Sequence, residues 1–218
     1  ASNSLTLSGL TALLAVALAV LLAYSARLSK TFLAQALNRL VGLGYAVPGT
    51  VIAVGVLIPV TRLDNWIAGQ WESAFGSNPG LILTGGIAAL IYAYLARFLA
   101  VALQTVDASL SKITPSMDDA ARSLGLGQGA TLRRVHVPIL RGSLFTAALL
   151  VFVDVMKELP ATLVMRPFNF DTLATQAYTL ASDERLTEAS TAALAIVAVG
   201  LLPLIALSRQ ISRARKST

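Results

Sequence analysis

The sequence predicts an all-α fold, a polytopic bundle of five helices that cross a membrane. Of the 218 residues, 56% are apolar and 13% are charged, and the mean hydropathy is +0.72. Soluble domains carry roughly 25% charged residues, so these values exclude a single compact water-facing domain, and the apolar content excludes disorder. The chain has no cysteine, which excludes disulfides, thiolate metal sites and cysteine nucleophiles.

Five segments contain the run of about 20 predominantly apolar residues that a spanning helix needs. They are residues 5–24, 40–60, 81–103, 144–164 and 189–207. The first segment lacks the basic start and the cleavage site of a signal peptide, which favours a spanning helix. Because residues 1–218 begin with Ala1 rather than Met, we expect one transmembrane domain that is processed or, preferably, part of a longer chain.

Small residues and one proline predict how two of these segments pack. Pro48 and Gly49 predict a kink or a local opening in the second segment. Gly85, Ala89 and Ala93 recur four residues apart in the third segment and predict a face for helix contact, since small residues let backbones approach closely in lipid.

The distribution of positive charge predicts the orientation. Most of the 17 Lys and Arg residues fall in the loops after the first and third segments and behind the fifth, where Arg209, Arg213, Arg215 and Lys216 cluster. The opposite side holds only Arg62, Arg166 and Arg185. The positive-inside rule then predicts an outer N-terminus and a cytoplasmic C-terminus, with Trp66 and Trp71 in an outer interfacial loop. Topology thus explains the net charge of +6, and nucleic-acid binding is not expected.

The loop between the third and fourth segments predicts a first short helix. Ser116 is a suitable N-cap, and Asp118 and Asp119 would lie in the first turn, where the helix dipole favours acids. One apolar face would contain residues spaced three and four apart, namely Met117, Ala120, Ala121 and Leu124.

A second short helix is predicted over residues 130–137. Gly125 and two further glycines separate it from the first, Arg133 lies within it, and Pro138 follows it. The pair is too polar to enter lipid. Its apolar face is suited either to a groove on a partner protein or to the lipid surface as an amphipathic connector, and the spacing leaves both open.

The same loop resembles the EAA signature of binding-protein-dependent ABC importer permeases. That signature is Glu-Ala-Ala, three residues, Gly, nine residues, Ile, one residue and Leu-Pro. Here Asp119-Ala120-Ala121 is followed by Gly125 at the required interval and then by Val135-His136-Val137-Pro138, with Asp for Glu and Val for Ile and Leu. The resemblance implies coupling helices that sit in a cleft of a cytoplasmic ATPase dimer. They would be formed by Asp118, Asp119, Ala120, Ala121, Leu124, Gly125, Arg133 and Pro138.

A further stretch is similar to the ferric-iron permeases of that family. It comprises KELPATL at 157–163, RPFNFDTLAT at 166–175 and ASDE at 181–184. Those permeases are usually one chain of two homologous halves, so the resemblance implies that this chain is the second half. Thiamine, polyamine and sulfate permeases are relatives and remain alternatives for the substrate.

Three charges fall inside the fourth segment. Each ionised group costs roughly 2.5–3.5 kcal/mol at the middle of a bilayer, so Asp154, Lys157 and Glu158 should face a water-filled path or one another. Their spacing places them on one helix face, where Lys157 neutralises one acid, and Pro160 would weaken the helix just beyond. We expect these four residues to line a translocation path for a cation. A structural ion pair, or charges at the outer rim, is the alternative.

Other polar residues are weaker candidates. Asp171, Asp183 and Glu184 in the predicted outer loop could contact a periplasmic solute-binding protein or form a solvated loop. His136 has no second histidine nearby, so no metal site is expected.

The sequence predicts a permease, not an enzyme. It contains no phosphate-binding loop of the Gly-x4-Gly-Lys type, no His-Glu-x-x-His and no Gly-x-Ser-x-Gly, although an intramembrane enzyme or a passive channel remains an alternative of another class.

The resemblance implies an ATP-driven importer of the bacterial inner membrane that moves ferric iron by alternating access. The chain would carry no cofactor, because ATP and Mg belong to the ATPase. Its partners would be that ATPase, the other permease half or a second copy, the binding protein and lipid, but not nucleic acid.

Overall fold

The computed structural model describes residues 1–29 and 31–216, apart from the side chains of residues 202–204 and 206–216. All regular structure in this part of the chain is helical, which confirms the predicted all-α fold. In chain order the elements are α1 (Ser2–Leu28), α2 (Phe32–Leu43), the 3-10 turn η1 (Gly44–Ala46), α3 (Gly49–Phe75), α4 (Ala88–Leu110), α5 (Pro115–Ser123), α6 (Gln128–Thr131), the π-helical segment η2 (Leu132–His136), α7 (Val137–Met156), α8 (Pro160–Met165), α9 (Leu173–Ser182) and α10 (Leu186–Lys216).

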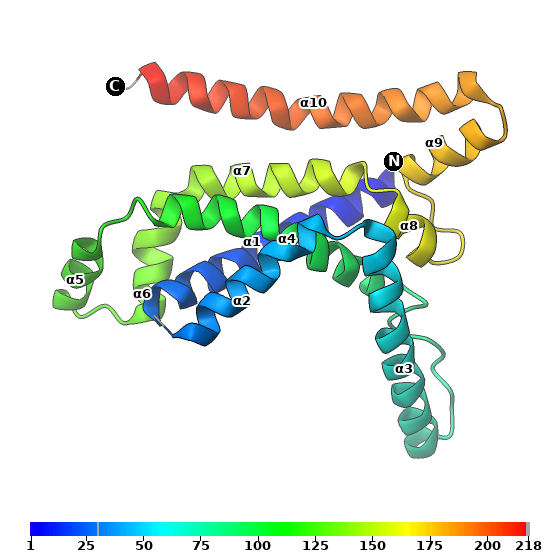
Figure 1. Ribbon diagram of the computed structural model, residues 1–218, viewed down its shortest axis with the longest axis horizontal. Helices are drawn as coiled ribbons and strands as arrows, with labels where there is room; N and C mark the ends of the chain where they lie inside the picture. Colours follow the sequence, from blue (N-terminus) through cyan, green and yellow to red (C-terminus); the bar gives the residue numbers. More distant parts are fainter. Residues whose placement is uncertain (30, 217–218) are drawn as a thin grey trace.

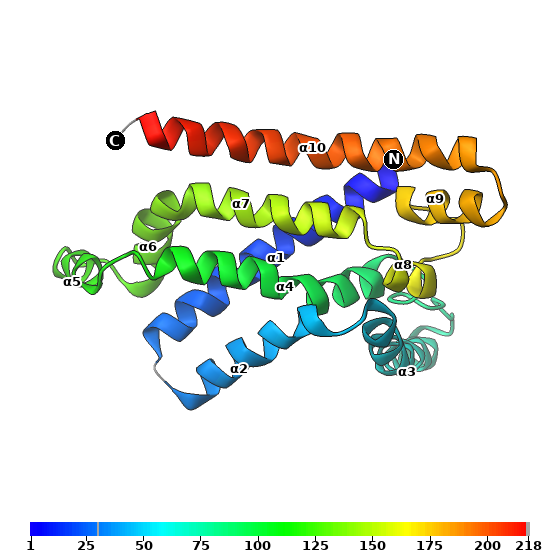
Figure 2. The same cartoon turned by 45° about the horizontal axis from the view of Figure 1, so that its top comes forward.

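The core lies between α1, α4 and α7: α4 and α7 run beside each other, and α1 packs against both at an angle (Figures 1 and 2). Small side chains line their contacts. Ala15 and Ala19 in α1, Ala93 in α4 and Ala147 in α7 are almost completely buried. Because apolar side chains gain little by leaving lipid, such small residues hold membrane helices together by letting their backbones approach.

Four helical runs in the described residues are long and apolar enough to cross a membrane. They are Ser2–Leu28, Gly49–Phe75, Ala88–Leu110 and Gln128–Met156. The first predicted segment, residues 5–24, lies wholly within α1.

The third predicted segment begins later than expected. Residues 81–87 form no helix, because the backbone N–H groups of Ile82, Leu83 and Thr84 donate to the buried carboxylate of Asp64 at 2.8 to 3.1 Å. The helix α4 therefore starts at Ala88. Gly85 lies outside it, and the predicted contact face is reduced to Ala89 and Ala93, both of which are buried.

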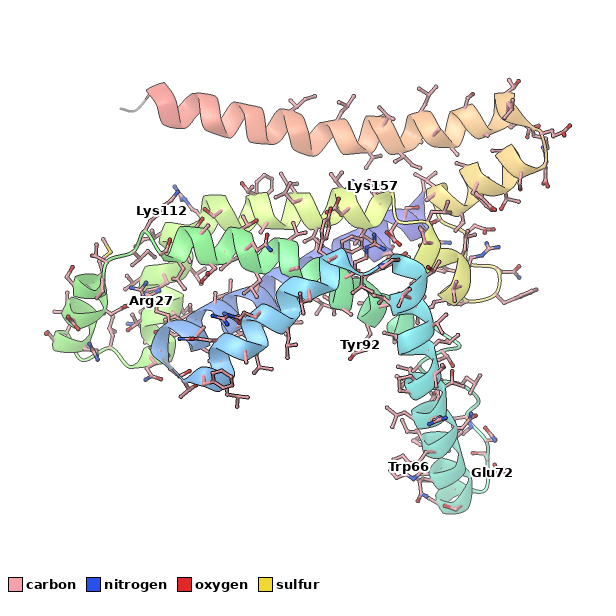
Figure 3. All side chains as sticks on the ribbon, in the orientation of Figure 1. Arg27, Trp66, Glu72, Tyr92, Lys112 and Lys157 are labelled. Atoms are coloured by element: carbon pink, nitrogen blue, oxygen red, sulfur yellow. The ribbon has the colours of Figure 1, made fainter. Side chains whose placement is uncertain are left out.

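The boundaries predicted for the second segment, residues 40–60, are wrong. The chain opens at Pro48, as predicted, and separates α2 and η1 from α3. The helix α3 then continues to Phe75, so Trp66 and Trp71 lie on a helix rather than in a loop. Asp64 lies in the polar second half of α3. Its buried carboxylate accepts hydrogen bonds from the backbone N–H groups at residues 82–84, which allows this half to stay helical. In Figure 3 α3 leaves the bundle and carries Trp66 and Glu72 on its distal half.

The fourth predicted segment is displaced toward the N-terminus. The residues of α6, η2 and α7 form one continuous helical run, Gln128–Met156, so the expected separate helix at 130–137 does not exist. Pro138 has no N–H to donate, and the helix accommodates it with the π segment η2, which ends two residues earlier at His136. The run ends at Met156, well before the predicted residue 164.

The fifth predicted segment, residues 189–207, lies on α10. The apolar helix described there is Leu186–Leu201. Apart from Ile205, the rest of the segment falls where the side chains are outside the described residues, as do Arg209, Arg213, Arg215 and Lys216. Figure 1 shows that the last turns of α10 lie at the end of the bundle that carries α5, whereas the N-terminus lies at the opposite end, near α8 and α9.

Candidate functional site

The helix α5 lies at one end of the bundle, between the ends of α4 and α6 (Figure 1). Its N-cap is Thr114 rather than the predicted Ser116. Pro115 occupies the first helical position, where its fixed φ suits a helix start. The residue before a proline is pushed to extended backbone, and Thr114 has ψ of 149°. The Thr114 and Ser116 hydroxyls then bond each other at 2.8 Å.

The predicted apolar face of α5 is divided between the protein and the surface. Ala121 is buried, whereas Ala120 is exposed, Met117 is 45% exposed and Leu124 is 82% exposed. We call Met117, Ala120 and Leu124 the α5 apolar patch. An apolar patch on a short helix that is otherwise polar is typical of a docking surface.

Gly125 ends α5 with a Schellman motif. Its φ of +78° lies in the left-handed region, its N–H donates to the Arg122 carbonyl at 2.9 Å, and the Leu126 N–H donates to the Ala121 carbonyl at 3.0 Å. Glycine is the residue that adopts this conformation without strain. The motif turns the chain sharply and leaves Leu124 projecting at the tip.

The two neighbouring acids of α5 have different surroundings. Asp119 is exposed and pairs with Arg122 on its own helix. Asp118 points inward, where its Oδ2 accepts from Arg27 Nη2 at 2.7 Å and its Oδ1 lies 2.6 Å from His136 Nε2. Burial alone would raise the pKa of the Asp118 carboxyl, but the hydrogen bonds from Arg27 and His136 outweigh it and hold this pKa below its usual value.

Arg27 and His136 were not predicted as functional residues, although both belong to this end of the bundle. Arg27 lies in the last turn of α1 and also donates to the Leu110 and Ile113 carbonyls at 3.0 and 2.9 Å. Figure 3 shows Arg27 at the same end as α5 and Lys112. His136 is fully buried. The Arg27 and Asp118 positions are far apart in the chain, so no local pattern could pair them.

The remaining predicted coupling residues follow α5. Arg133 lies in η2 and Pro138 is the second residue of α7, and both are exposed. The structure therefore gathers the predicted coupling residues at one end of the bundle (Figure 1).

The three charges predicted to share one helix face do not do so. Because α7 ends at Met156, Glu158 leaves the helix that carries Asp154. Lys157 pairs with Asp154 at 2.9 Å and is 61% exposed. Glu158 is 7% exposed, and its Oε1 accepts from Arg97 Nη1 of α4 at 3.4 Å and from the Ala161 N–H at 3.2 Å.

Glu158 thereby fixes the start of α8. The prediction that Pro160 weakens a helix is wrong. Pro160 is the first residue of α8, so it begins a helix. The Thr162 hydroxyl donates to the Glu158 carbonyl at 2.7 Å and also bonds the Tyr94 hydroxyl of α4. These bonds hold α8 against α4.

Gly49, the first residue of α3, lies against both Arg97 and Glu158. A Cβ there would lie 2.5 Å from Glu158 Oε1 and closer still to Arg97 Nη1. The start of α3, the middle of α4 and the start of α8 thus meet at the Arg97–Glu158 pair, which we call the membrane ion pair. Glu158 is predictable from the sequence as a charge in an apolar segment, but its neighbours Arg97 and Gly49 are not, because they belong to different helices.

The residues predicted to contact a binding protein lie at the end opposite α5. Asp171 is exposed between α8 and α9 and pairs with Arg166, whereas Asp183 and Glu184 are exposed between α9 and α10 (Figure 1). Glu184 has φ of +61°, a conformation that costs a non-glycine residue roughly 1–2 kcal/mol. In the residues that the structure describes, no three or more His, Asp or Glu side chains group in a way that could hold a metal ion.

We expect Gly49→Ala to lower stability by about 1 kcal/mol, because the added methyl group forces the membrane ion pair apart. Thermal unfolding in detergent measures the change. Gly55→Ala is the matched control in the same helix, since a Cβ there meets nothing within 4 Å, and it should be neutral or stabilising by roughly 0.5–1 kcal/mol. Equal effects of the two substitutions would contradict the crowding at Gly49.

Comparison with known proteins gives relatives that match most of the chain. The Fe(3+)-transport system permease protein FbpB 2 of Haemophilus influenzae is 29% identical over 208 residues, which are 95% of this chain and 38% of that protein. The ferric transport system permease protein FbpB of Actinobacillus pleuropneumoniae is 27% identical over 198 residues, 88% of this chain and 28% of that one. This chain therefore spans well under half the length of these two relatives.

A Salmonella typhimurium permease whose name assigns it to 2-aminoethylphosphonate transport is 24% identical over 164 residues, 75% of this chain and 56% of that protein. Among solved structures, a bacterial alginate ABC transporter in complex with an alginate pentasaccharide-bound periplasmic protein superposes with a TM-score of 0.70 at 18% identity. The superposition covers 98% of this chain and 77% of that chain, and at this identity it establishes the fold alone.

The family described as "Binding-protein-dependent transport system inner membrane component" matches residues 15–217. That match covers nearly the whole chain, including α5, the Gly125 turn and the membrane ion pair. The chain is therefore a multi-pass membrane protein that belongs to the inner-membrane permease family of binding-protein-dependent transport systems.

Proposed function

We propose that this chain is one half of the membrane pore of an ATP-driven importer, and that α5 couples it to a separate ATPase. The α5 apolar patch, which ends at the Gly125 turn, carries this proposal. The patch stands at the end of the bundle, and the two ends of α5 are joined to the membrane helices. A partner that pulled or pushed on α5 would therefore act on those helices.

The partner proposed for the α5 apolar patch is a cytoplasmic ATPase dimer, which supplies ATP and Mg, so this chain needs no cofactor of its own. Membership of an inner-membrane transport family supports this choice over the lipid surface. The second pore half would be either the remainder of a longer chain or another copy. The relatives' greater length supports the longer chain.

The proposed orientation has α5 and the C-terminus in the cytoplasm and the N-terminus outside. The positive-inside rule supports it, and so does the position of Asp171, Asp183 and Glu184 at the end opposite α5. In this orientation the three acids face the periplasm, where a solute-binding protein would dock.

Ferric iron is the proposed solute, since the names of two relatives that match most of this chain assign them to its transport. Thiamine, polyamine and sulfate remain alternatives, and a named relative adds 2-aminoethylphosphonate. The solute would pass between the two pore halves by alternating access. The membrane ion pair and the Asp154–Lys157 pair are proposed to border that path, because charged groups within membrane helices are otherwise costly.

Gly125→Val should impair the assembly of the ATPase with the permease and reduce ATP-dependent uptake. A β-branched residue at φ of +78° costs roughly 1–2 kcal/mol, so the turn changes and the α5 apolar patch moves. Co-purification of the ATPase and uptake into proteoliposomes measure the effect. Gly129→Ala, at a helical glycine where a Cβ meets nothing within 4 Å, is the matched control. Normal assembly and uptake with Gly125→Val would refute the coupling role.

The solute can be assigned by the binding protein that stimulates ATP hydrolysis. We expect a binding protein loaded with ferric iron to raise the ATPase rate of the full-length transporter in proteoliposomes. Binding proteins loaded with thiamine or 2-aminoethylphosphonate are the comparison arms. Stimulation by one of these and not by the ferric form would exclude iron while leaving the transporter class intact.

Glu158→Gln should lower ferric iron uptake at least about tenfold, because it leaves the charge of Arg97 uncompensated beside the proposed path of a cation. Lys157→Gln should have a smaller effect, since Lys157 is largely exposed. Uptake and thermal stability are measured on the same preparations. A lowered melting temperature with unchanged uptake would show that the membrane ion pair is structural only.

A further inference from the structure

We propose that Arg27, Asp118 and His136 form a clamp that fixes α5 to the membrane helices and so makes its movement drive theirs. The inference rests on the proposed coupling function of α5. In this role Asp118 positions α5 inside the permease, which is distinct from contact with the ATPase. Arg27 and His136 are positioning residues with it.

On one side the clamp reaches α1 and α4. The Arg27 guanidinium donates to Asp118 Oδ2 through both Nε and Nη2, at 3.0 and 2.7 Å. Its other bonds go to the carbonyls of Leu110, the last residue of α4, and of Ile113, in the turn that follows. One planar side chain therefore holds the last turn of α1, the last turn of α4 and the first turn of α5 in a single geometry, as the rigid fork of arginine permits.

On the other side the clamp reaches the helical run Gln128–Met156. His136 Nε2 lies 2.6 Å from Asp118 Oδ1, and because the carboxylate can only accept, Nε2 donates. The imidazole is fully buried, and the Tyr24 ring of α1 packs edge-on against it at 5.2 Å between centroids. The Tyr24 hydroxyl donates to the Gln128 carbonyl, so α1 holds the same run at a second point.

Without Asp118, α5 has few anchors. Ala121 is its one buried residue, and the rest of the helix apart from Asp118 is exposed. At its two ends the chain turns, at Thr114–Pro115 and at Gly125. Both oxygens of a single carboxylate therefore join α5 to the ends of the membrane helices. A force applied to the α5 apolar patch reaches these helices through Asp118.

The neighbouring acid, Asp119, does not attach α5 to the membrane helices. It is exposed and its partner, Arg122, belongs to the same helix, so it connects α5 to nothing else in the described residues. The two adjacent acids therefore have different roles. Asp119 is available to a partner, and Asp118 holds the helix to its own chain.

The first test measures the position of α5 without any ATPase or solute. The chain has no native cysteine, so Ser111→Cys at the end of α4 and Ser123→Cys on α5, both exposed, give one spin-label pair in it. The full-length permease, freed of other cysteines, is the starting protein. We expect a narrow distance distribution that broadens with Asp118→Asn. Asp107→Asn is the matched control, because Asp107 is an exposed acid on α4 outside the clamp, and its distribution should stay narrow.

The second test measures coupling in proteoliposomes that hold the full-length transporter, its ATPase and a binding protein loaded with ferric iron. For Asp118→Asn and His136→Leu we expect the ATPase to stay bound and basal ATP hydrolysis to continue. Uptake per ATP hydrolysed should fall about tenfold, the factor that corresponds to one charge-assisted hydrogen bond. His136→Gln should restore coupling, because its amide nitrogen can donate at the position of Nε2. The double variant Asp118→Asn with His136→Leu should lose little more than either single one.

The clamp is overturned if Asp118→Asn leaves the distance distribution narrow, or if uptake per ATP is unchanged in both single variants. It is also overturned if His136→Gln behaves like His136→Leu. Failure of the proposed function has a different signature, because the unmodified permease would then not retain the ATPase at all. Failure of ferric iron as the solute would abolish uptake in the unmodified transporter too, but would leave the distance measurement intact.

Discussion

Close contact between α1, α4 and α7 is the constraint on which the rest of the structure depends. In lipid these helices gain little from burying apolar side chains, so their association rests on backbones brought together by small residues. The buried alanines, among them Ala15 and Ala19 in α1 and Ala147 in α7, supply those contacts. The packing also aligns the helix ends. Arg27 can reach the Leu110 carbonyl at the end of α4, the Ile113 carbonyl just beyond it and the carboxylate of Asp118 only because α1 and α4 end side by side.

Carboxylates removed wholly or largely from water organise the remaining structure: Asp64 and Glu158 are buried, and Asp118 is 24% exposed. Asp64 accepts from the backbone at residues 82–84, Glu158 from the Ala161 N–H and Arg97, and Asp118 from Arg27 and His136. A charge removed from water has to be paired and hydrogen-bonded, and each of these acids meets that requirement with groups from another part of the chain. Each therefore fixes a boundary or a junction: the late start of α4, the start of α8 and the attachment of α5.

One continuous helix connects the two candidate regions. The run Gln128–Met156 begins beside the Asp118 clamp and ends just before Lys157 and Glu158. A helix of this length transmits a displacement better than a chain of loops would, because its backbone hydrogen bonds keep it rigid along its axis. The π segment at residues 132–136 lies in this run directly beside Asp118. The two candidate regions are thus connected by a single helical run.

By itself, the sequence determined the all-α class, the first spanning helix, the opening at Pro48 and the α5 loop with its Gly125 turn. These features depend on composition, on apolar runs and on local backbone preferences, which neighbouring residues decide. The tertiary structure alone decided where α3, α4 and α7 begin or end, since the groups that satisfy Asp64 and Glu158 come from other segments. It also decided that Asp118 faces Arg27 and His136 while Asp119 faces outward, because partners distant in the chain leave no periodic pattern. The charges were visible in the sequence, but their partners depended on how the helices pack.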